Sequence, residues 1–479
     1  METIEQAKLV NIPPRNNSES FRDAIATVDR RGRRIWIYPK KPSGPFYTAR
    51  TIVSIFLLAI LFAGPFVRLN GQPLLLLNVL ERKFIIFGLA FWPQDFHLFV
   101  LATIAVIVFI LLFTAVFGRV WCGWACPQTV FMEMVFRRIE YWIEGDARKQ
   151  RALDAGPWTA EKIIKKGTKH LIFFTISFLI GNIFLAYIIG SDRLLDIVTD
   201  PPWEHWGGFL AVLFFSLLFY WIFSYFREQA CTLVCPYGRF QSVLLDKNSI
   251  VISYDFIRGE PRSKFSKRQS REGLGDCIDC RLCVDVCPTG IDIRNGTQLE
   301  CINCTACIDA CNTVMERVGF PKGLIRFSSY NGIIEGRKQI ITPRVLGYTV
   351  LLLFLIGALV YMLLGRSDIE ATILRAPGVL YQEMADGYIS NLYTVKIVNK
   401  TFKKLPVEFR LKSLPGRINV VGSKLVVPPD GLAESALFVE LPRDQIHSEN
   451  AKVTIEVLSG GKVLDEVKTT FIAPASNGE

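Results

Sequence analysis

Two cysteine runs with the same spacing constrain this chain more than any other feature. Each run reads C-x2-C-x2-C-x3-C, which is the ligand spacing of bacterial ferredoxins with two 4Fe-4S clusters. In such ferredoxins three thiolates of a run hold one cluster and the fourth crosses to the neighbouring cluster. The pattern therefore predicts two clusters, one held by Cys277, Cys280, Cys283 and Cys311 and the other by Cys301, Cys304, Cys307 and Cys287.

Structural zinc sites are the alternative, because zinc ribbons and fingers also use C-x2-C pairs. Those sites separate two pairs by a longer spacer, whereas each run here packs its cysteines into eleven residues. Asn312 stands where the first run has Pro288, a difference that removes no ligand. The spacing favours iron-sulfur clusters.

The hydrophobic residues, half of the 479, are gathered in blocks. A transmembrane helix needs about 20 consecutive apolar residues. Five blocks are long enough: 49–69, 98–118, 170–190, 207–226 and 345–364. The shorter apolar stretch 83–93 predicts a strand, a re-entrant segment or an interfacial helix. The chain is therefore predicted to be an integral membrane protein.

The net charge of +11 is distributed as the positive-inside rule requires, so it needs no nucleic-acid partner. Lys and Arg number eight in segment 22–50 and nine in 137–170, but three in 68–97 and one in 191–206. This asymmetry predicts that the N-terminus and segment 227–344 are cytoplasmic and, with five spans, that the C-terminal segment is external. No apolar h-region precedes the first span, so we expect no cleavable signal peptide.

The other four cysteines form an internal repeat at the ends of two spans. The motifs are Cys122-x3-Cys126-Pro127 and Cys231-x3-Cys235-Pro236. Each pair lies at i and i+4, so on a helical turn both sulfurs would face the same way, and the proline would break or bend the helix. Both motifs end an inward-directed span, which predicts two parallel repeats whose thiols meet at one soft metal or redox site.

Several occupants of this four-thiol site stay open. Zinc, copper, an iron-sulfur cluster and a redox dithiol are all candidates, and apolar packing of the cysteines is the alternative without chemistry. Met132 and Met134 follow Cys126 and could add thioether ligands, but packing is the role that we expect for both. No cysteine is followed by histidine, so the C-x-x-C-H signature of c-type haem attachment is absent.

The last part of the chain predicts an antiparallel β-sandwich. From about residue 385 to 475 short runs alternate apolar and polar positions, with turn residues between them, such as 428–431 and Gly460-Gly461. No catalytic cluster is evident there, so a binding or docking module is expected.

Together these features predict a multidomain membrane protein. Its fold class is an α-helical transmembrane bundle with a two-cluster ferredoxin-like α+β cytoplasmic domain and a C-terminal β-sandwich. The predicted boundaries are an N-terminal cytoplasmic segment 1–48, a four-span domain 49–226, the ferredoxin-like domain 227–344, the fifth span 345–364 and the external domain 365–479.

With these motifs in place, the chain resembles the CcoG/FixG/RdxA family of cytochrome c oxidase accessory proteins, which are membrane polyferredoxins. The resemblance rests on the paired WCGWACP and ACTLVCP motifs, the two ferredoxin runs, the five spans and the tail, and covers nearly the whole chain. Membrane ferredoxins of the quinol-dehydrogenase type share the cysteine motifs but are not expected to carry this tail. The resemblance implies an immunoglobulin-like periplasmic sandwich and a place in the bacterial cytoplasmic (inner) membrane.

The resemblance also implies an oxidoreductase that converts Cu(II) to Cu(I) during assembly of a cbb-type cytochrome c oxidase. Electrons would enter at the ferredoxin domain and reach copper near Cys122, Cys126, Cys231 and Cys235. Thiolates stabilise Cu(I) more than Cu(II) and so favour reduction. The expected partners are membrane lipid, the oxidase or its copper-assembly factors, and a cytoplasmic electron donor, and a homodimer stays open. Because the thiols lie at the predicted cytoplasmic span ends, cytoplasmic copper is the simpler substrate.

Two other functions stay open. One is a quinol- or quinone-linked electron conduit to a partner enzyme, and the other is a non-enzymatic assembly scaffold or redox sensor. The donor is not named by the sequence, because no G-x-G-x-x-G fingerprint of a flavin or nicotinamide site follows a recognisable strand.

Overall fold

The computed structural model describes most of the chain. The described residues are 26–29, 31–69, 71–79, 83–265, 272–336, 340–378, 380–422, 425–446 and 448–474. The first 25 residues of the predicted N-terminal segment, and Arg30, lie outside them. Contacts divide the chain into two compact units, one comprising 1–67 and 103–355 and the other comprising 68–102 and 356–479.

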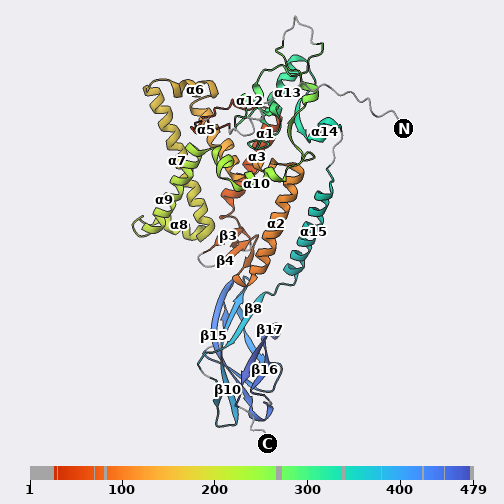
Figure 1. Ribbon diagram of the computed structural model, residues 1–479. Helices are drawn as coiled ribbons and strands as arrows, with labels where there is room; N and C mark the ends of the chain where they lie inside the picture. The colour runs from red at the N-terminus through yellow and green to blue at the C-terminus, as the bar shows by residue number, and fades with distance from the viewer. Residues whose placement is uncertain are drawn as a thin grey trace, which may run out of the picture. The chain divides into compact units, whose positions relative to one another are not determined.

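In the described part of the chain, five helices are long and apolar enough to cross a membrane, as the sequence predicted. They are α1 (Pro45–Ala63), α2 (Phe96–Phe117), α7 (Ala160–Ile189), α9 (Trp206–Trp221) with its π-helical extension η4 (Ile222–Phe226), and α15 (Pro343–Leu364) (Figure 1). No more than 33% of the most apolar window of each helix is buried. Exposed apolar faces of this kind are what helices surrounded by lipid present.

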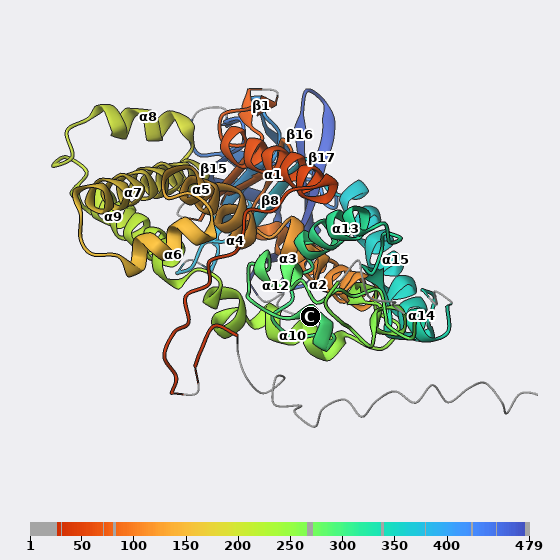
Figure 2. The same ribbon diagram turned by 90° about the horizontal axis from the view of Figure 1, so that it is seen from above.

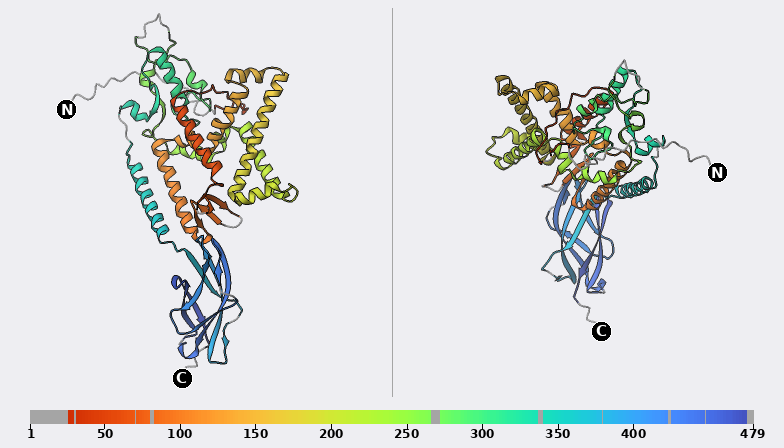
Figure 3. Two further views of the ribbon diagram at one scale, coloured as in Figure 1. Left: turned by 180° about the vertical axis from the view of Figure 1, so that it is seen from behind. Right: turned by 45° about the horizontal axis from the view of Figure 1, so that its top comes forward.

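The second pair of spans is built around aromatic side chains. Helices α7 and α9 run side by side and are joined through α8 (Ser191–Thr199) (Figures 1 and 3). The π-helical segment η3 (Val130–Phe136) packs against both, because the fully buried Phe136 ring lies 4.7 Å from Phe173 and 4.9 Å from Phe223. The segment after the first C-x3-C-P motif therefore becomes part of the core of the second span pair. It continues as α5 (Arg137–Ile143) and α6 (Ala147–Ala155).

The ferredoxin-like part belongs to the same unit as most of the spans. It contains the antiparallel strands β6 (Val251–Tyr254) and β7 (Ile325–Ser328), with the helices α11 (Phe256–Gly259), α12 (Leu282–Asp285), α13 (Ala306–Val318) and α14 (Tyr330–Ile334). Figure 2 shows α12 and α13 beside one another. The Asp309 carboxylate on α13 accepts hydrogen bonds from the backbone N–H groups of Phe46 and Tyr47, at 3.3 and 2.8 Å. A carboxylate at a helix N-terminus is favourable, so this contact ties α1 to the ferredoxin-like part.

In the second unit, segment 83–93 forms strands, the first of the three structures predicted for it. The sheet consists of β3 (Leu75–Asn78), β4 (Lys83–Ile86) and β5 (Leu89–Phe91), preceded by the short pair β1 (Arg68–Leu69) and β2 (Gln72–Pro73). Asp95 follows the sheet and is buried, with carboxylate oxygens 2.7 Å from Lys400 Nζ and 2.7 Å from an Arg366 nitrogen. These two ion pairs join segment 68–102 to the start of the C-terminal domain.

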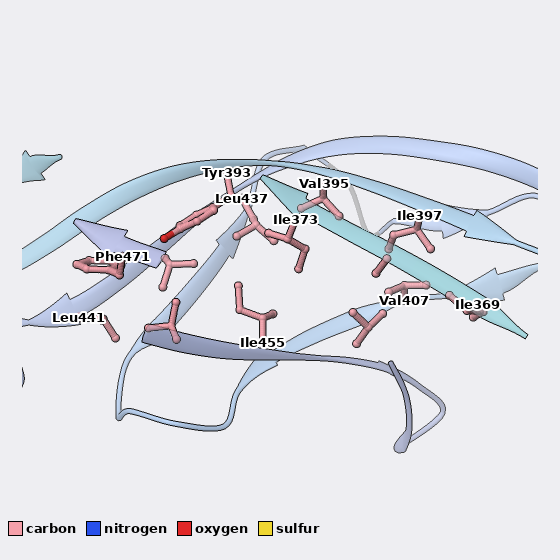
Figure 4. Packing of buried hydrophobic residues seen from close by; sticks show 14 of the residues in the cluster. Ile369, Ile373, Tyr393, Val395, Ile397, Val407, Leu437, Leu441, Ile455 and Phe471 are labelled. Carbon is pink, nitrogen blue, oxygen red and sulfur yellow. The ribbon is translucent and has the colours of Figure 1, made fainter. Parts of the chain in front are cut away.

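The C-terminal domain is the antiparallel sandwich that the alternating pattern predicted. One sheet has the order β13 (Arg417–Val420), β15 (Gly431–Pro442), β10 (Tyr388–Asn399), β8 (Ile369–Arg375), with β9 (Gln382–Glu383) on β10. The other has the order β12 (Glu408–Leu411), β16 (Asn450–Ser459), β17 (Lys462–Ile472), and β11 (Leu405–Pro406) pairs with β14 (Val426–Val427). Figure 4 shows Tyr393, Val395 and Ile397 of one sheet in the same core as Ile455 of the other. Strand β8 lies inside the predicted domain 365–479 but before residue 385, where the predicted alternating runs begin.

Candidate iron-sulfur and four-thiol sites

The eight ferredoxin cysteines gather around two cavities. Cys277, Cys280, Cys283 and Cys311 line the first, together with Tyr254 and Arg294. Cys287, Cys301, Cys304 and Cys307 line the second, and Cys283 reaches its wall as well. These are the two ligand sets that the crossed arrangement predicts, with the fourth cysteine of each run beside the first three of the other run.

The backbone repeats itself around the two sets. Asp279 and Arg281, two and four residues after Cys277, have φ angles of 49° and 57°, and Asn303 and Thr305, at the same offsets from Cys301, have 54° and 65°. Non-glycine residues seldom adopt positive φ, and such conformations persist where the surrounding structure fixes them. The two runs therefore fold as equivalent loops, each followed by a helix: α12 carries Cys283, and α13 carries Cys307 and Cys311.

Burial disfavours the deprotonated, thiolate form of these cysteines unless a cation lies nearby. It raises the pKa of Cys301 to about 12 and that of Cys304 to about 11. Burial also raises the pKa of Cys287, although the backbone N–H groups of Thr289, Gly290 and Ile291 favour its thiolate. Thiolates are the ligand form, so positively charged iron would supply the stabilisation that burial removes.

The spread of the thiols also fits a cluster. Within the described residues, no three His, Cys, Asp or Glu side chains converge closely enough to hold a single metal ion. Four thiolates that bind four different irons of one cluster lie farther apart than the ligands of one ion. The donor type, burial and cavities of the two sets therefore fit 4Fe-4S clusters better than structural zinc.

The crossed assignment makes a direct prediction for serine substitutions. Cys287→Ser and Cys301→Ser should alter one cluster, whereas Cys277→Ser and Cys311→Ser should alter the other, and each variant should lose up to about four of about eight irons. Iron analysis with potentiometric electron paramagnetic resonance would distinguish the two signals. A shared signal altered by both Cys287→Ser and Cys277→Ser would contradict the crossing.

The structure also brings the four C-x3-C-P thiols together. The charge of a Cys122 thiolate would interact with those of Cys126 and Cys235, and that of Cys231 with all three others. Burial raises the pKa of Cys231 to about 12. The two motifs therefore lie near enough for their thiolate charges to interact, and their sharing of one metal or redox site stays a prediction.

The local geometry differs from the predicted helical turns. Cys122 lies in α3 (Val120–Trp124) and Cys231 in the π-helical segment η5 (Ala230–Val234), but Cys126 (φ −61°, ψ 126°) and Cys235 (φ −65°, ψ 110°) are extended. A residue before proline is driven out of the helical region, and proline favours the first position of a helix. Each Cys-Pro step therefore ends one helix and starts the next, α4 (Pro127–Thr129) or α10 (Pro236–Leu244).

Arg119 and Gln241, which the sequence analysis did not single out, form hydrogen bonds at the four-thiol site. The Cys122 thiol donates to Gln241 Oε1 at 3.3 Å, and Arg119 Nε donates to the same oxygen at 3.0 Å. Arg119 Nη1 also donates to the backbone carbonyl of Leu299, close to the second ligand set. Both side chains are buried, so Arg119 links the two sites through polar contacts.

The four-thiol site packs directly on the second ligand set. Cys122 shares a hydrophobic cluster with Ile302 and Cys304. Gly123 is buried there, and a Cβ atom at this position would lie 2.4 Å from the Ile302 carbonyl oxygen. The Gly123 carbonyl accepts a hydrogen bond of 2.6 Å from Arg50 Nε of α1. No larger residue fits between the first C-x3-C-P motif and the loop that carries Cys301 and Cys304.

The comparisons with known families agree with this arrangement. Residues 226–330 match a family described as a 4Fe-4S dicluster domain, residues 99–149 a 4Fe-4S binding domain, and residues 359–474 the IG-like fold at the C-terminus of FixG. With the five spans and the buried thiols, these matches define a membrane-bound iron-sulfur electron-transfer protein.

Curated relatives then give the family. The chain is 31% identical to "Nitrogen fixation protein FixG" of Rhizobium meliloti, over 86% of this chain and 87% of that protein. It is 35% and 36% identical to the proteins RdxA and RdxB of Cereibacter sphaeroides, over 76% of this chain and 79% of theirs. The chain therefore belongs to the FixG/CcoG/RdxA family. A crystal structure of a FixG-related protein from Vibrio parahaemolyticus is 19% identical and matches 23% of this chain and all of that one, with a TM-score of 0.20.

Proposed function

We propose that this protein reduces Cu(II) to Cu(I) and so supports copper delivery during assembly of a cbb-type cytochrome c oxidase. One observation carries the proposal: the four soft thiols lie near enough for their charges to interact, and Cys122 shares a buried hydrophobic cluster with Cys304 of the second ligand set. Bound 4Fe-4S clusters would supply single electrons. Thiolates of Cys122, Cys126, Cys231 and Cys235 would bind copper and favour its reduced state.

The membrane placement in this proposal follows the charge pattern. The N-terminus and the ferredoxin-like part would lie in the cytoplasm, the immunoglobulin-like domain in the periplasm, and the spans in the bacterial inner membrane. The substrate would be cytoplasmic Cu(II), the donor a cytoplasmic reductant, and the periplasmic domain would dock on the oxidase or a copper-assembly factor.

The test measures copper reduction and metal content together. The protein is purified anaerobically in mild detergent, iron, copper, zinc and sulfide are quantified, and Cu(I) formation is followed with a Cu(I)-specific chelator after reduction of the clusters. The wild type should carry about eight irons and reduce Cu(II). Cys122→Ser/Cys231→Ser should keep that iron and lose the reduction. Reduction at the wild-type rate in this variant would refute the assignment.

A second candidate has a specific observation in its favour. Residues 99–149 match a 4Fe-4S binding domain, and the cysteines within that range are Cys122 and Cys126. The four thiols would then hold a third cluster, and the chain would be an electron conduit to a quinone or a partner enzyme. About twelve irons in the wild type, falling to about eight in Cys122→Ser/Cys231→Ser without any effect of copper, would favour this candidate.

A further inference from the structure

A third cavity lies between the four-thiol site and the second ligand set. Cys231 of the four-thiol site lines one side, and Pro288, Thr289 and Ile302, which adjoin the ligand cysteines Cys287 and Cys301 in sequence, line another. Side chains from α4, from η3 and from the turn between η4 and η5 complete the wall. Both C-x3-C-P repeats and the ferredoxin-like part therefore contribute to one cavity.

Two sulfur atoms belong to residues of this wall. Met132 of η3, which is 4% exposed, and Cys231 of η5 both line the cavity. Both residues lie on π-helical segments, which are rare and often mark functional sites. Thiolate and thioether sulfur together form a ligand pair that selects soft metal ions such as Cu(I). The position of Met132 beside Cys231 in the wall of one cavity could not be predicted from the sequence alone.

The charged residues of the wall are Glu133, Glu228 and Arg227, and their balance bears on which ion fits. Glu228 is 6% exposed and its Oε2 atom accepts no hydrogen bond, although Arg137 and Arg227 nitrogens lie 3.6 and 3.9 Å away. Glu133, the other carboxylate of the wall, is held by Arg137 at 2.6 Å. Because arginines balance both carboxylates, the cavity has little excess negative charge. That balance favours a monovalent soft ion over a hard divalent one, which needs several anionic oxygens.

We propose that this cavity binds Cu(I), with Met132 and Cys231 as sulfur ligands and Glu228 Oε2 as the adjacent oxygen donor. On binding, the Cys231 sulfur exchanges its proton for the ion and the proton leaves to solvent, so no electron is needed for the binding step. The proposal rests on the proposed function for the source of Cu(I), and it makes the cavity the place through which the reduced ion leaves the four thiols.

The test is an equilibrium competition that requires no turnover. Detergent-solubilised protein with intact clusters is titrated anaerobically with Cu(I) against a chromogenic Cu(I) chelator, for the wild type, Met132→Leu and Met134→Leu. Met134 is the matched control, because it lies on the same π-helical segment and is buried, but is not part of the cavity wall. Met132→Leu should weaken Cu(I) binding at least about tenfold, as loss of a metal-supporting group does. Met134→Leu should stay within about twofold, and the iron content of both variants should be unchanged.

Other outcomes separate the two proposals. Equal affinity of Met132→Leu and wild type, or equal weakening by both methionine variants, overturns the cavity as the Cu(I) site. A wild type that reduces Cu(II), with a Cu(I) affinity that Met132→Leu leaves unchanged, overturns the cavity and leaves the proposed function intact. Tight, Met132-dependent Cu(I) binding in a protein that cannot reduce Cu(II) supports the cavity and refutes the proposed function.

Discussion

On the function proposed above, replacing Gly123 by valine should slow copper reduction on the order of 10²-fold while the iron content stays at the wild-type level. The Cβ atom would lie 2.4 Å from the Ile302 carbonyl oxygen and 2.9 Å from the Asn303 carbonyl carbon, both backbone atoms. Backbone cannot turn aside as a flexible side chain can, so α3 and the loop with Cys301 and Cys304 must separate. A misplacement of about 1 Å at a reacting centre can cost this much in rate. Stopped-flow reoxidation of the reduced clusters by Cu(II) would measure the rate.

The matched control for this change is Gly167→Val. Gly167 also lies within a helix, and a Cβ atom there would meet no neighbouring atom within 4 Å. Gly167→Val therefore introduces the same β-branched residue into a helix, with the same conformational cost, but without a collision with neighbouring backbone. Wild-type reoxidation rates in Gly123→Val would show that electrons do not pass through the contact between Gly123 and Ile302.

The two groups of cysteines that line the cavities were predictable because ligand chemistry fixes the spacing of such residues. A 4Fe-4S cluster needs thiolates at set separations, so the crossed sets could be written from the positions of the cysteines alone. The spans were equally readable, since a bilayer requires long apolar helices. The extended conformation at Cys126 and Cys235 was also within reach, because each precedes a proline. The prediction that each cysteine pair lies on one helical turn was wrong at these two residues, because it neglected the restriction that the following proline imposes.

The surroundings of the sites depend on tertiary contacts that local sequence does not encode. Arg119 reaches Gln241 and the carbonyl of Leu299, which are 122 and 180 residues away. Asn303 and Thr305 take positive φ without being glycine, so no residue type announced those turns. Gly123 is visible in the motif WCGWACP, but the motif alone does not predict that the backbone of Ile302 packs where a side chain at Gly123 would lie.

Replacing Arg137 by methionine should lower the free energy of unfolding of the membrane part by about 3–5 kcal/mol, the usual cost of removing one partner of a buried ion pair. The Arg137 side chain is 1% exposed and lies 2.6 Å from Glu133 and 3.6 Å from Glu228. Burial alone would lower the pKa of Arg137, but the carboxylates around it hold that pKa above its usual range. Without the guanidinium, Glu133 and Glu228 keep buried charges with fewer partners, which destabilises the contact between the two C-x3-C-P repeats. Unfolding in mixed micelles of mild detergent and sodium dodecyl sulfate, followed by near-ultraviolet circular dichroism, would measure the change.

The exposed pair of Lys165 and Glu161 provides the control, since side chains that are 35% and 69% exposed are screened by water. Lys165→Met should cost less than about 1 kcal/mol. The double variant Arg137→Met/Glu133→Leu should be more stable than Arg137→Met alone, because it removes an orphaned buried carboxylate as well. If Arg137→Met and Lys165→Met destabilised the protein equally, the charges around Arg137 would not hold the two repeats together, and the aromatic core around Phe136 would carry that role.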